Sequence, residues 1–223
     1  MSVLILGTAN FGVEYKGRKV QDPHGVLGLA AVAGMAVETA RAYGVAERIV
    51  GEWGESNGYP SLIIGKGNSL FEKRLSERIL GKIDIYLAHS GECFDPSIHD
   101  GLSAYERTDD DSDAKIVEVP LSILDQRWMS VPTTSPSRRL VRSIFARGAV
   151  FERPALKRIA ADTGFSIVEL CLGFVRHHKP AGIVVGVDSV AQLDEIMAAR
   201  PLPAEVLPEL AKLDERLDLR AGR

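Results

Sequence analysis

The sequence predicts an α/β fold, a (β/α)8 or TIM barrel that is shortened, with one or two outer helices reduced or missing. Short apolar runs bounded by Gly, Pro, Asp or Ser alternate with longer amphipathic segments, which is typical of strand–helix units around a parallel sheet. Eight strand candidates can be found in the 223 residues. A barrel of this kind usually has about 250 residues. We therefore expect residues 1–223 to form a single, slightly shortened barrel domain.

The strand candidates are short and rich in Val, Ile and Leu. Seven have clear boundaries, and an eighth, DGLSAYE, is weaker because only its central residues favour a strand. The clear candidates are residues 3–8, 36–40, 61–66, 83–89, 115–122, 139–145 and 182–187, and the weaker one is 100–106. The glycine-rich stretches GTANFG and GKGNS lack the pattern of a Rossmann turn or a P-loop, so we expect them to be turns of the barrel.

The helical segments are longer, and several begin with capping residues. Asp22 precedes Pro23, Ser69 and Ser189 precede helical patterns, and Ser166 is followed by Glu169 as in a capping box. The expected helices are residues 22–35, 44–53, 69–82, 152–164, 166–179, 189–199 and 202–217. The segments 90–100 and 106–115 are too short to hold a helix of normal length, so the outer helices are expected to be lost there.

Composition excludes several function classes. The formal net charge is −3, whereas nucleic-acid and anionic-membrane surfaces need clustered Lys and Arg. No stretch approaches the roughly 20 apolar residues of a membrane span. The two cysteines, Cys93 and Cys171, have no zinc or dithiol spacing, and the acidic run TDDDSD lacks the glycine and glutamate of an EF-hand loop. We expect a soluble cytoplasmic protein without a metal site.

Polar residues follow the second, third and fourth strands. Glu38 lies in the second strand and Tyr43 follows it. Lys66 ends the third strand, and His89 ends the fourth. Because the carboxyl ends of barrel strands gather at one face, where active sites lie, these four side chains should converge. Each of them alone has an ordinary structural explanation, but their order at successive strand ends favours a site.

This set resembles the tetrad of the aldo-keto reductases. LILGTANFG is similar to the opening strand of that family, AYGVAERIVGE to its tyrosine turn, GLSAYE to its fifth-strand motif and VVGVDSVAQLDEIM to its cofactor clamp. EVPLSILDQRW and VRSIFARGAV are most similar to the branch found with polysaccharide and deoxysugar biosynthesis. The resemblance covers nearly the whole chain apart from the two short gaps and about the last twenty residues.

The resemblance implies a role for each of the four residues. Tyr43 would donate a proton to the developing alkoxide, although a free phenol has a pKa near 10. Lys66 would tune the phenol by favouring its ionised form, and Glu38 would hold the lysine in place. His89 would orient the substrate carbonyl for a hydride from a nicotinamide.

The resemblance also implies a cofactor site that takes NADP or NAD. Its residues would be Gly7, Thr8, Ser103, Glu118, Arg142, Ser143, Gly186, Asp188, Ser189, Gln192 and Glu195. The chain departs from the family pattern at four positions. Glu38 replaces an aspartate, Glu118 replaces a glutamine, Arg142 replaces an aromatic platform, and Asp188 lies where many members have Lys or Arg against the 2′-phosphate of NADP.

These observations leave three functions open. The first is the NAD(P)H-dependent reduction of a sugar-like or other polar aldehyde or ketone. The second is a degenerate family member that serves as a binding or assembly protein, and the third is cofactor-free acid–base chemistry on a sugar. Residues 201–223 predict a helix and a charged tail rather than a long lid, so the pocket is either open or closed by a neighbouring subunit of a homo-oligomer.

Overall fold

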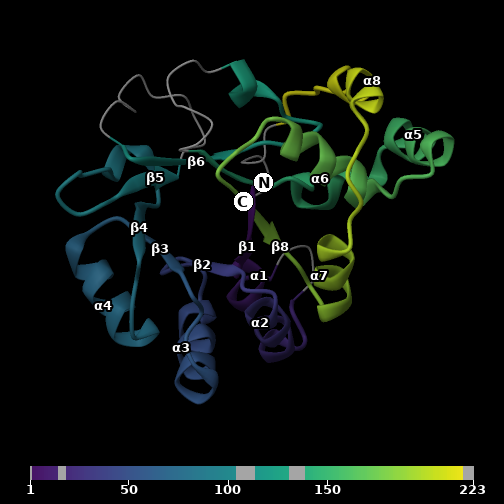
Figure 1. Cartoon of the computed structure of the whole chain (residues 1–223). Helices are drawn as coiled ribbons and strands as arrows, with labels where there is room; N and C mark the ends of the chain where they lie inside the picture. Colours follow the sequence, from purple (N-terminus) through teal and green to yellow (C-terminus); the bar gives the residue numbers. More distant parts are fainter. Residues whose placement is uncertain (1, 15–18, 104–113, 131–138, 218–223) are drawn as a thin grey trace.

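The computed structural model describes residues 2–14, 19–103, 114–130 and 139–217, and these form a closed barrel of eight parallel strands in sequential order (Figure 1). The strands are β1 (Val3–Gly7), β2 (Ala36–Ala40), β3 (Ile63–Gly67), β4 (Ile85–Ala88), β5 (Gly101–Ser103), β6 (Ile116–Pro120), β7 (Arg139–Arg142) and β8 (Gly182–Gly186). Each one overlaps a predicted strand, and β1 pairs with β8 to close the ring. The (β/α)8 prediction is confirmed.

Helices lie outside this ring of strands (Figure 1). The longer ones are α2 (Pro23–Val32), α3 (Ala46–Asn57), α4 (Leu70–Leu80), α5 (Pro154–Thr163), α6 (Ile167–His177) and α7 (Val190–Met197). Four begin at the predicted caps. The side chains of Asp22, Ser69 and Ser189 each accept a hydrogen bond from a backbone N–H of the first turn, and Ser166 and Glu169 form a capping box.

Two connections differ from the usual strand–helix alternation. Between β4 and β5 the chain forms only a 3-10 turn, Gly91–Cys93, which confirms that one outer helix is lost. The second expected loss falls mostly on residues 104–113, outside the described residues, as do Tyr105 and the rest of the predicted fifth strand. After β1, the expected turn instead contains a one-turn helix, α1 (Ala9–Gly12).

Two predicted elements were too long. The strand expected to reach residue 145 ends at Arg142, because Ser143 has a positive φ of 59°. The helix expected over 202–217 is only a 3-10 turn, Ala204–Val206, followed by α8 (Leu207–Ala211). Beyond α8, the backbone N–H of Glu215 donates to the carbonyl of Leu124 at 3.0 Å, so the tail packs against the loop after β6 instead of continuing a helix.

The side chains along each strand point alternately toward the outer and the inner face of the barrel. Residues such as Leu6, Val37 and Ile63 belong to the large core between strands and helices. The opposite face supplies a separate apolar cluster inside the barrel, formed by Ile5, Ala36, Ile64, Leu87, Leu140 and Val184. Because side chains of a strand alternate with a period of two, the positions two residues further along face the interior again. Five of these positions carry polar side chains and form a polar layer, Glu38, Lys66, His89, Glu118 and Arg142, while Gly7 and Gly186 leave space beside it.

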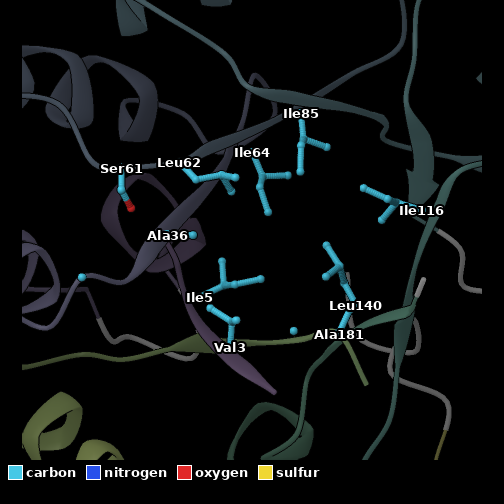
Figure 2. Close-up of a pocket in the computed structure, with 12 residues that line it drawn as sticks. Val3, Ile5, Ala36, Ser61, Leu62, Ile64, Ile85, Ile116, Leu140 and Ala181 are labelled. Carbon is cyan, nitrogen blue, oxygen red and sulfur yellow. The ribbon is translucent and has the colours of Figure 1, made fainter. Parts of the chain in front are cut away.

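A cavity of about 310 Å³ lies at the opposite end of the barrel. Its lining includes the first residues of β1, β2, β4 and β6, so it opens at the amino ends of the strands. Figure 2 shows the apolar side chains of Ile64, Ile85 and Leu140 pointing toward this space. Active sites of such barrels lie at the carboxyl ends, so the cavity is separate from the predicted site. No helix among the described residues is long and apolar enough to cross a bilayer.

Candidate active site

Lys66 lies between two carboxylates inside the barrel. Its Nζ forms an ion pair with Glu38 Oε1 and a second one, at 3.0 Å, with Glu118 Oε1. The three residues come from β3, β2 and β6, and each is at most 2% exposed. The pairing of Glu38 with Lys66, which the resemblance implied, is therefore present despite the longer side chain of glutamate. The pairing with Glu118 is an addition that the sequence did not reveal.

One carboxylate oxygen of Glu118, Oε1, contacts three donor groups. Besides Lys66, its Oε1 accepts from Ser103 Oγ at 2.9 Å and pairs with Arg142 Nε at 3.0 Å. The two carboxylates and two cations of this cluster are formally neutral together, which is what a buried group of charges requires. By contrast, Glu118 Oε2 is buried and has no hydrogen-bond partner among the described residues. The roles of these residues in cofactor binding remain predictions.

Tyr43 is placed above this cluster by the turn after β2. Its hydroxyl donates to Glu38 Oε1 at 3.5 Å, and Lys66 Nζ lies 5.2 Å from the centre of its ring. His89, directly after β4, meets the ring edge-to-face with centroids 5.9 Å apart. The structure thus brings together all four residues that the sequence predicted from separate strand ends.

Burial and charge have opposite effects on the ionisable groups of this site. Burial raises the pKa of Glu38 even though Lys66 opposes it. Burial also disfavours a charged Glu118, but Lys66 and Arg142 outweigh it and lower the pKa of Glu118. The two carboxylates differ because Glu118 pairs directly with Arg142 and accepts a hydrogen bond from Ser103, whereas the effect of Arg142 on Glu38 is the last of the causes that shift its pKa.

Lys66 and Tyr43 are both held in their protonated forms. Burial disfavours the ammonium of Lys66, but Glu118 and Glu38 together raise its pKa well above the ordinary value. The pKa of Tyr43 is also raised, first by burial and then by the charge of Glu38, and Lys66 only partly opposes this. Lys66 thus acts on Tyr43 in the expected direction, toward the phenolate, but burial and the charge of Glu38 outweigh it.

Sequence reasoning missed three groups that fix the turn carrying Tyr43. Glu47, at the start of α3, is 2% exposed and accepts from Arg41 Nη1 and from Ser76 Oγ, both at 2.6 Å. Arg41 and Glu47 flank Tyr43 in the chain, so their ion pair closes the turn, and Ser76 ties it to α4. The signal in the sequence was only a charged pair six residues apart, which is common on solvated surfaces.

A second polar group lies where β8 leads into α7. Asn10 Nδ2 donates to Asp188 Oδ1 at 2.8 Å, and Gln192 Oε1 accepts from the backbone N–H of Asp188 at 2.7 Å. The Ser189 hydroxyl caps α7 by accepting from the N–H of Gln192. Asn10 was not singled out in the sequence, although it lies in the motif LILGTANFG. Glu195 is exposed on α7.

The groups at this end of the barrel fit a nicotinamide cofactor. Glu118 Oε2 is a buried acceptor that can take a hydrogen bond from an amide N–H. Thr8 Oγ1, at the end of β1, is likewise buried without a hydrogen-bond partner in the described part of the chain. A Cβ on the exposed Gly186 would have Asn10, 3.8 Å away, as its nearest neighbour, which leaves open space beside the strand end.

Known structures share this architecture. No family model and no curated protein matches the sequence. An aldo-keto reductase (AKR2E5) of the silkworm, Bombyx mori, matches with a TM-score of 0.72 and 14% identity over 97% of this chain and 85% of its own. Aldo-keto reductase AKR11C1 from Bacillus halodurans matches with a TM-score of 0.71 and 20% identity over 96% and 92% of the two chains.

A putative 2,5-diketo-D-gluconic acid reductase B matches with a TM-score of 0.71 and 18% identity, over 95% of this chain and 87% of that one. The silkworm enzyme has also been described in complex with NADPH, and that structure matches with a TM-score of 0.73. At these identities the likeness concerns the fold. It extends over nearly all of this chain, and the protein therefore has the (β/α)8 barrel fold of the aldo-keto reductases.

Proposed function

We propose that this protein is an NAD(P)H-dependent carbonyl reductase that converts an aldehyde or ketone into an alcohol, with Tyr43 as the proton donor. The observation that carries the proposal is the contact of Tyr43 with both Glu38 and Lys66, beside His89, at the carboxyl ends of the barrel strands. A phenol, an ammonium and an imidazole around one point suit the stabilisation of a developing alkoxide.

Each of these residues has a distinct task. A bound nicotinamide would supply the hydride, and Glu118 Oε2 and Thr8 Oγ1 would hold its amide group. Tyr43, protonated at neutral pH, donates its proton to the substrate oxygen. His89 donates a hydrogen bond to the same oxygen and so orients the carbonyl. Lys66 places a fixed positive charge beside the phenol, which stabilises the tyrosinate as it forms.

The substrate that we propose is polar, such as a sugar-like aldehyde or ketone. The side chains of Glu38, Lys66, Tyr43 and His89 make this end of the barrel polar and charged, which suits a polar substrate. The similar architecture of a putative 2,5-diketo-D-gluconic acid reductase B supports this class.

A cofactor titration tests the proposal. Purified protein is titrated with NADPH and, separately, with NADH, and the fluorescence of the nicotinamide and of the protein is recorded. We expect saturable binding of at least one cofactor, followed by turnover of polar aldehydes. Tyr43→Phe should keep the binding and lose the turnover. Absence of binding at millimolar concentrations of both cofactors would rule the reductase out.

The pairing of Lys66 with two buried carboxylates also favours a second function. Burial and the charge of Glu38 raise the pKa of Tyr43 more than Lys66 lowers it, so the phenol is a weaker acid than a free one. A barrel in which hydride transfer has been lost, and which acts in binding or assembly, is compatible with that cluster. This second function predicts that the folded protein binds neither NADPH nor NADH and sediments as a stable oligomer.

A further inference from the structure

One carboxylate contacts both the lysine and the tyrosine of the proposed site. Glu38 Oε1 pairs with Lys66 Nζ, and the same oxygen accepts from the hydroxyl of Tyr43 at 3.5 Å. A group needed only to anchor the lysine would not have to reach the phenol. The single oxygen between the two side chains therefore links the proton donor directly to a negative charge.

The barrel accommodates the length of this side chain at Gly7. A Cβ built on Gly7 would lie 3.3 Å from Glu38 Oε2 and 2.8 Å from a methyl of Val184. The second carboxylate oxygen therefore uses the space that a side chain at position 7 would occupy. Glu38 is also 2% exposed, so no bulk water competes for its oxygens. Its position is set by packing on one side and by Lys66 on the other.

We infer that Glu38 is a positioning residue for Tyr43 as well as for Lys66, and that its carboxylate keeps the phenol a hydrogen-bond donor in the free protein. An ionised Tyr43 would place two negative oxygens within 3.5 Å of each other, which is unfavourable in a buried site. Burial is the first cause of the raised pKa of Tyr43, and the charge of Glu38 is the second, ahead of the opposing effect of Lys66. The catalytic consequence rests on the function proposed above, because a phenol kept protonated is ready for reduction.

Other charges also act on Tyr43. Lys66 favours the phenolate, but it is shared with Glu118, and Arg142 is paired with that same carboxylate. Glu38 is the carboxylate in direct contact with the phenol, so its removal should have the largest effect. The charged groups that act on Tyr43 are Glu38 on β2, Lys66 on β3 and Glu118 on β6, and the ring of His89, after β4, meets Tyr43 edge-to-face. Arg142 on β7 is paired with Glu118.

The test measures the titration of Tyr43 directly. Tyrosinate absorbance is recorded against pH for the cofactor-free protein, and the curve of the Tyr43→Phe variant is subtracted to remove the other tyrosines. Glu38→Gln should move the midpoint of Tyr43 downward by about 1 pH unit or more. Glu38→Asp, whose carboxylate is shorter by one methylene, should move it in the same direction by less.

Glu118→Gln is the matched control. It also removes a buried carboxylate beside Lys66, but one without a hydrogen bond to Tyr43, and it should shift the midpoint less than Glu38→Gln. Unfolding is monitored by circular dichroism. If wild-type Tyr43 does not ionise before the protein unfolds, a tyrosinate titration of Tyr43 that is seen in folded Glu38→Gln but not in folded Glu118→Gln supports the inference. An unmoved midpoint in Glu38→Gln, or equal shifts in the two Gln variants, would overturn it.

Catalysis provides a second readout. In Glu38→Gln, the alkaline fall of kcat/KM for carbonyl reduction should move to lower pH by the same amount as the phenol midpoint. A merely structural role for Glu38 would lower kcat/KM at all pH values without moving the profile. Because the absorbance titration needs neither cofactor nor substrate, failure of the reductase proposal would appear as absent nicotinamide binding and would leave this result intact.

Discussion

Gly12 packs directly against the backbone of Tyr43. A Cβ at position 12 would lie 1.7 Å from the carbonyl oxygen of Tyr43, far inside contact distance. On the other side of the contact, Gly44 has a φ of +61°, and a Cβ there would lie 2.7 Å from the carbonyl oxygen of Gly12. The short helix α1 and the turn that carries Tyr43 therefore meet backbone to backbone.

Gly12→Ala should displace this turn. Because the methyl group meets backbone and not a flexible side chain, the overlap can be relieved only by moving the turn or α1. We expect a loss of about 1–3 kcal/mol in the free energy of unfolding. If Tyr43 is the proton donor, a displacement of about 1 Å should also reduce kcat on the order of a hundredfold. Denaturant unfolding and steady-state kinetics check the two effects.

Gly28→Ala, in the middle of α2, is the matched control. A Cβ there has no heavy atom within 4 Å, so the change should increase stability by about 0.5–1 kcal/mol, as expected for a helical glycine. Activity should not change. Equal behaviour of the two alanine variants would contradict the tight contact at Gly12.

Lys66→Met should be strongly destabilising. The side chain is 2% exposed and is the shared partner of Glu38 and Glu118, so its loss leaves two buried carboxylates, of which Glu118 retains its pairing with Arg142. Removal of one member of a buried ion cluster costs about 3–5 kcal/mol. The exposed pair of Lys212 and Glu209 offers a control, since Lys212→Met should cost no more than about 1 kcal/mol.

The defect of Lys66→Met should depend on pH with a definite sign. Burial already raises the pKa of Glu38, and without Lys66 it should rise further. A carboxyl whose pKa is higher in the folded than in the unfolded chain favours folding when it is protonated, and this contribution is lost as pH rises through the folded pKa. The variant should therefore lose less stability, relative to wild type, at mildly acidic than at neutral pH. If the stability difference between the variant and wild type instead grew as the pH fell, the raised pKa of Glu38 would not be its cause.

Glu47→Gln should loosen the Tyr43 turn without touching the proposed reacting groups. The amide can still contact Ser76, but it loses the ion pair with Arg41 at 2.6 Å. Because a buried partner of a charge pair is involved, we expect about 1–3 kcal/mol of destabilisation. Glu52→Gln removes the partner of the exposed Arg48 in the same helix and should be nearly silent. Thermal unfolding of both variants, side by side, is the measurement.

Glu169 should make part of the stability sensitive to acid. Hydrogen bonds from Arg200, and the capping-box N–H of Ser166, lower its pKa from the ordinary 4.5 to about 2. A depressed carboxyl pKa stabilises the fold above the ordinary value, and the stabilisation disappears as pH falls through the folded pKa. The difference in unfolding temperature between wild type and Glu169→Gln should thus be full above about pH 4.5 and shrink toward pH 2. A difference independent of pH would contradict this account.

Asp188 provides a prediction about the proposed cofactor. Its carboxylate is fixed by Asn10 at the start of α7, and helix starts after the last strands of such barrels commonly bind phosphate. A carboxylate there repels a 2′-phosphate. Asp188→Lys should strengthen NADPH binding relative to NADH by about tenfold or more, and high salt should reduce the gain. Asp194→Lys, the same charge change further along α7, should leave the ratio of the two dissociation constants unchanged.

The local features of the chain were readable from its sequence. Short apolar runs marked seven strands clearly and β5 more weakly, because a buried parallel strand needs apolar side chains on both faces. The caps at Asp22, Ser69, Ser166 and Ser189 were predictable because capping involves residues only a few positions apart. The order of Glu38, Tyr43, Lys66 and His89 at strand ends predicted a shared site, because a closed parallel barrel brings those ends together.

Only the tertiary structure decided how the charges are shared. The partnership of Lys66 with Glu118 joins residues 52 positions apart, and no local pattern encodes the distance between β3 and β6 across a barrel interior. The contact of Gly12 with Tyr43 and the pairing of Glu215 with the loop after β6 depend in the same way on how separate segments pack. The sequence thus determined which groups reach the site, whereas packing across the barrel determined their partners, because burial and distance set the energies of buried charges.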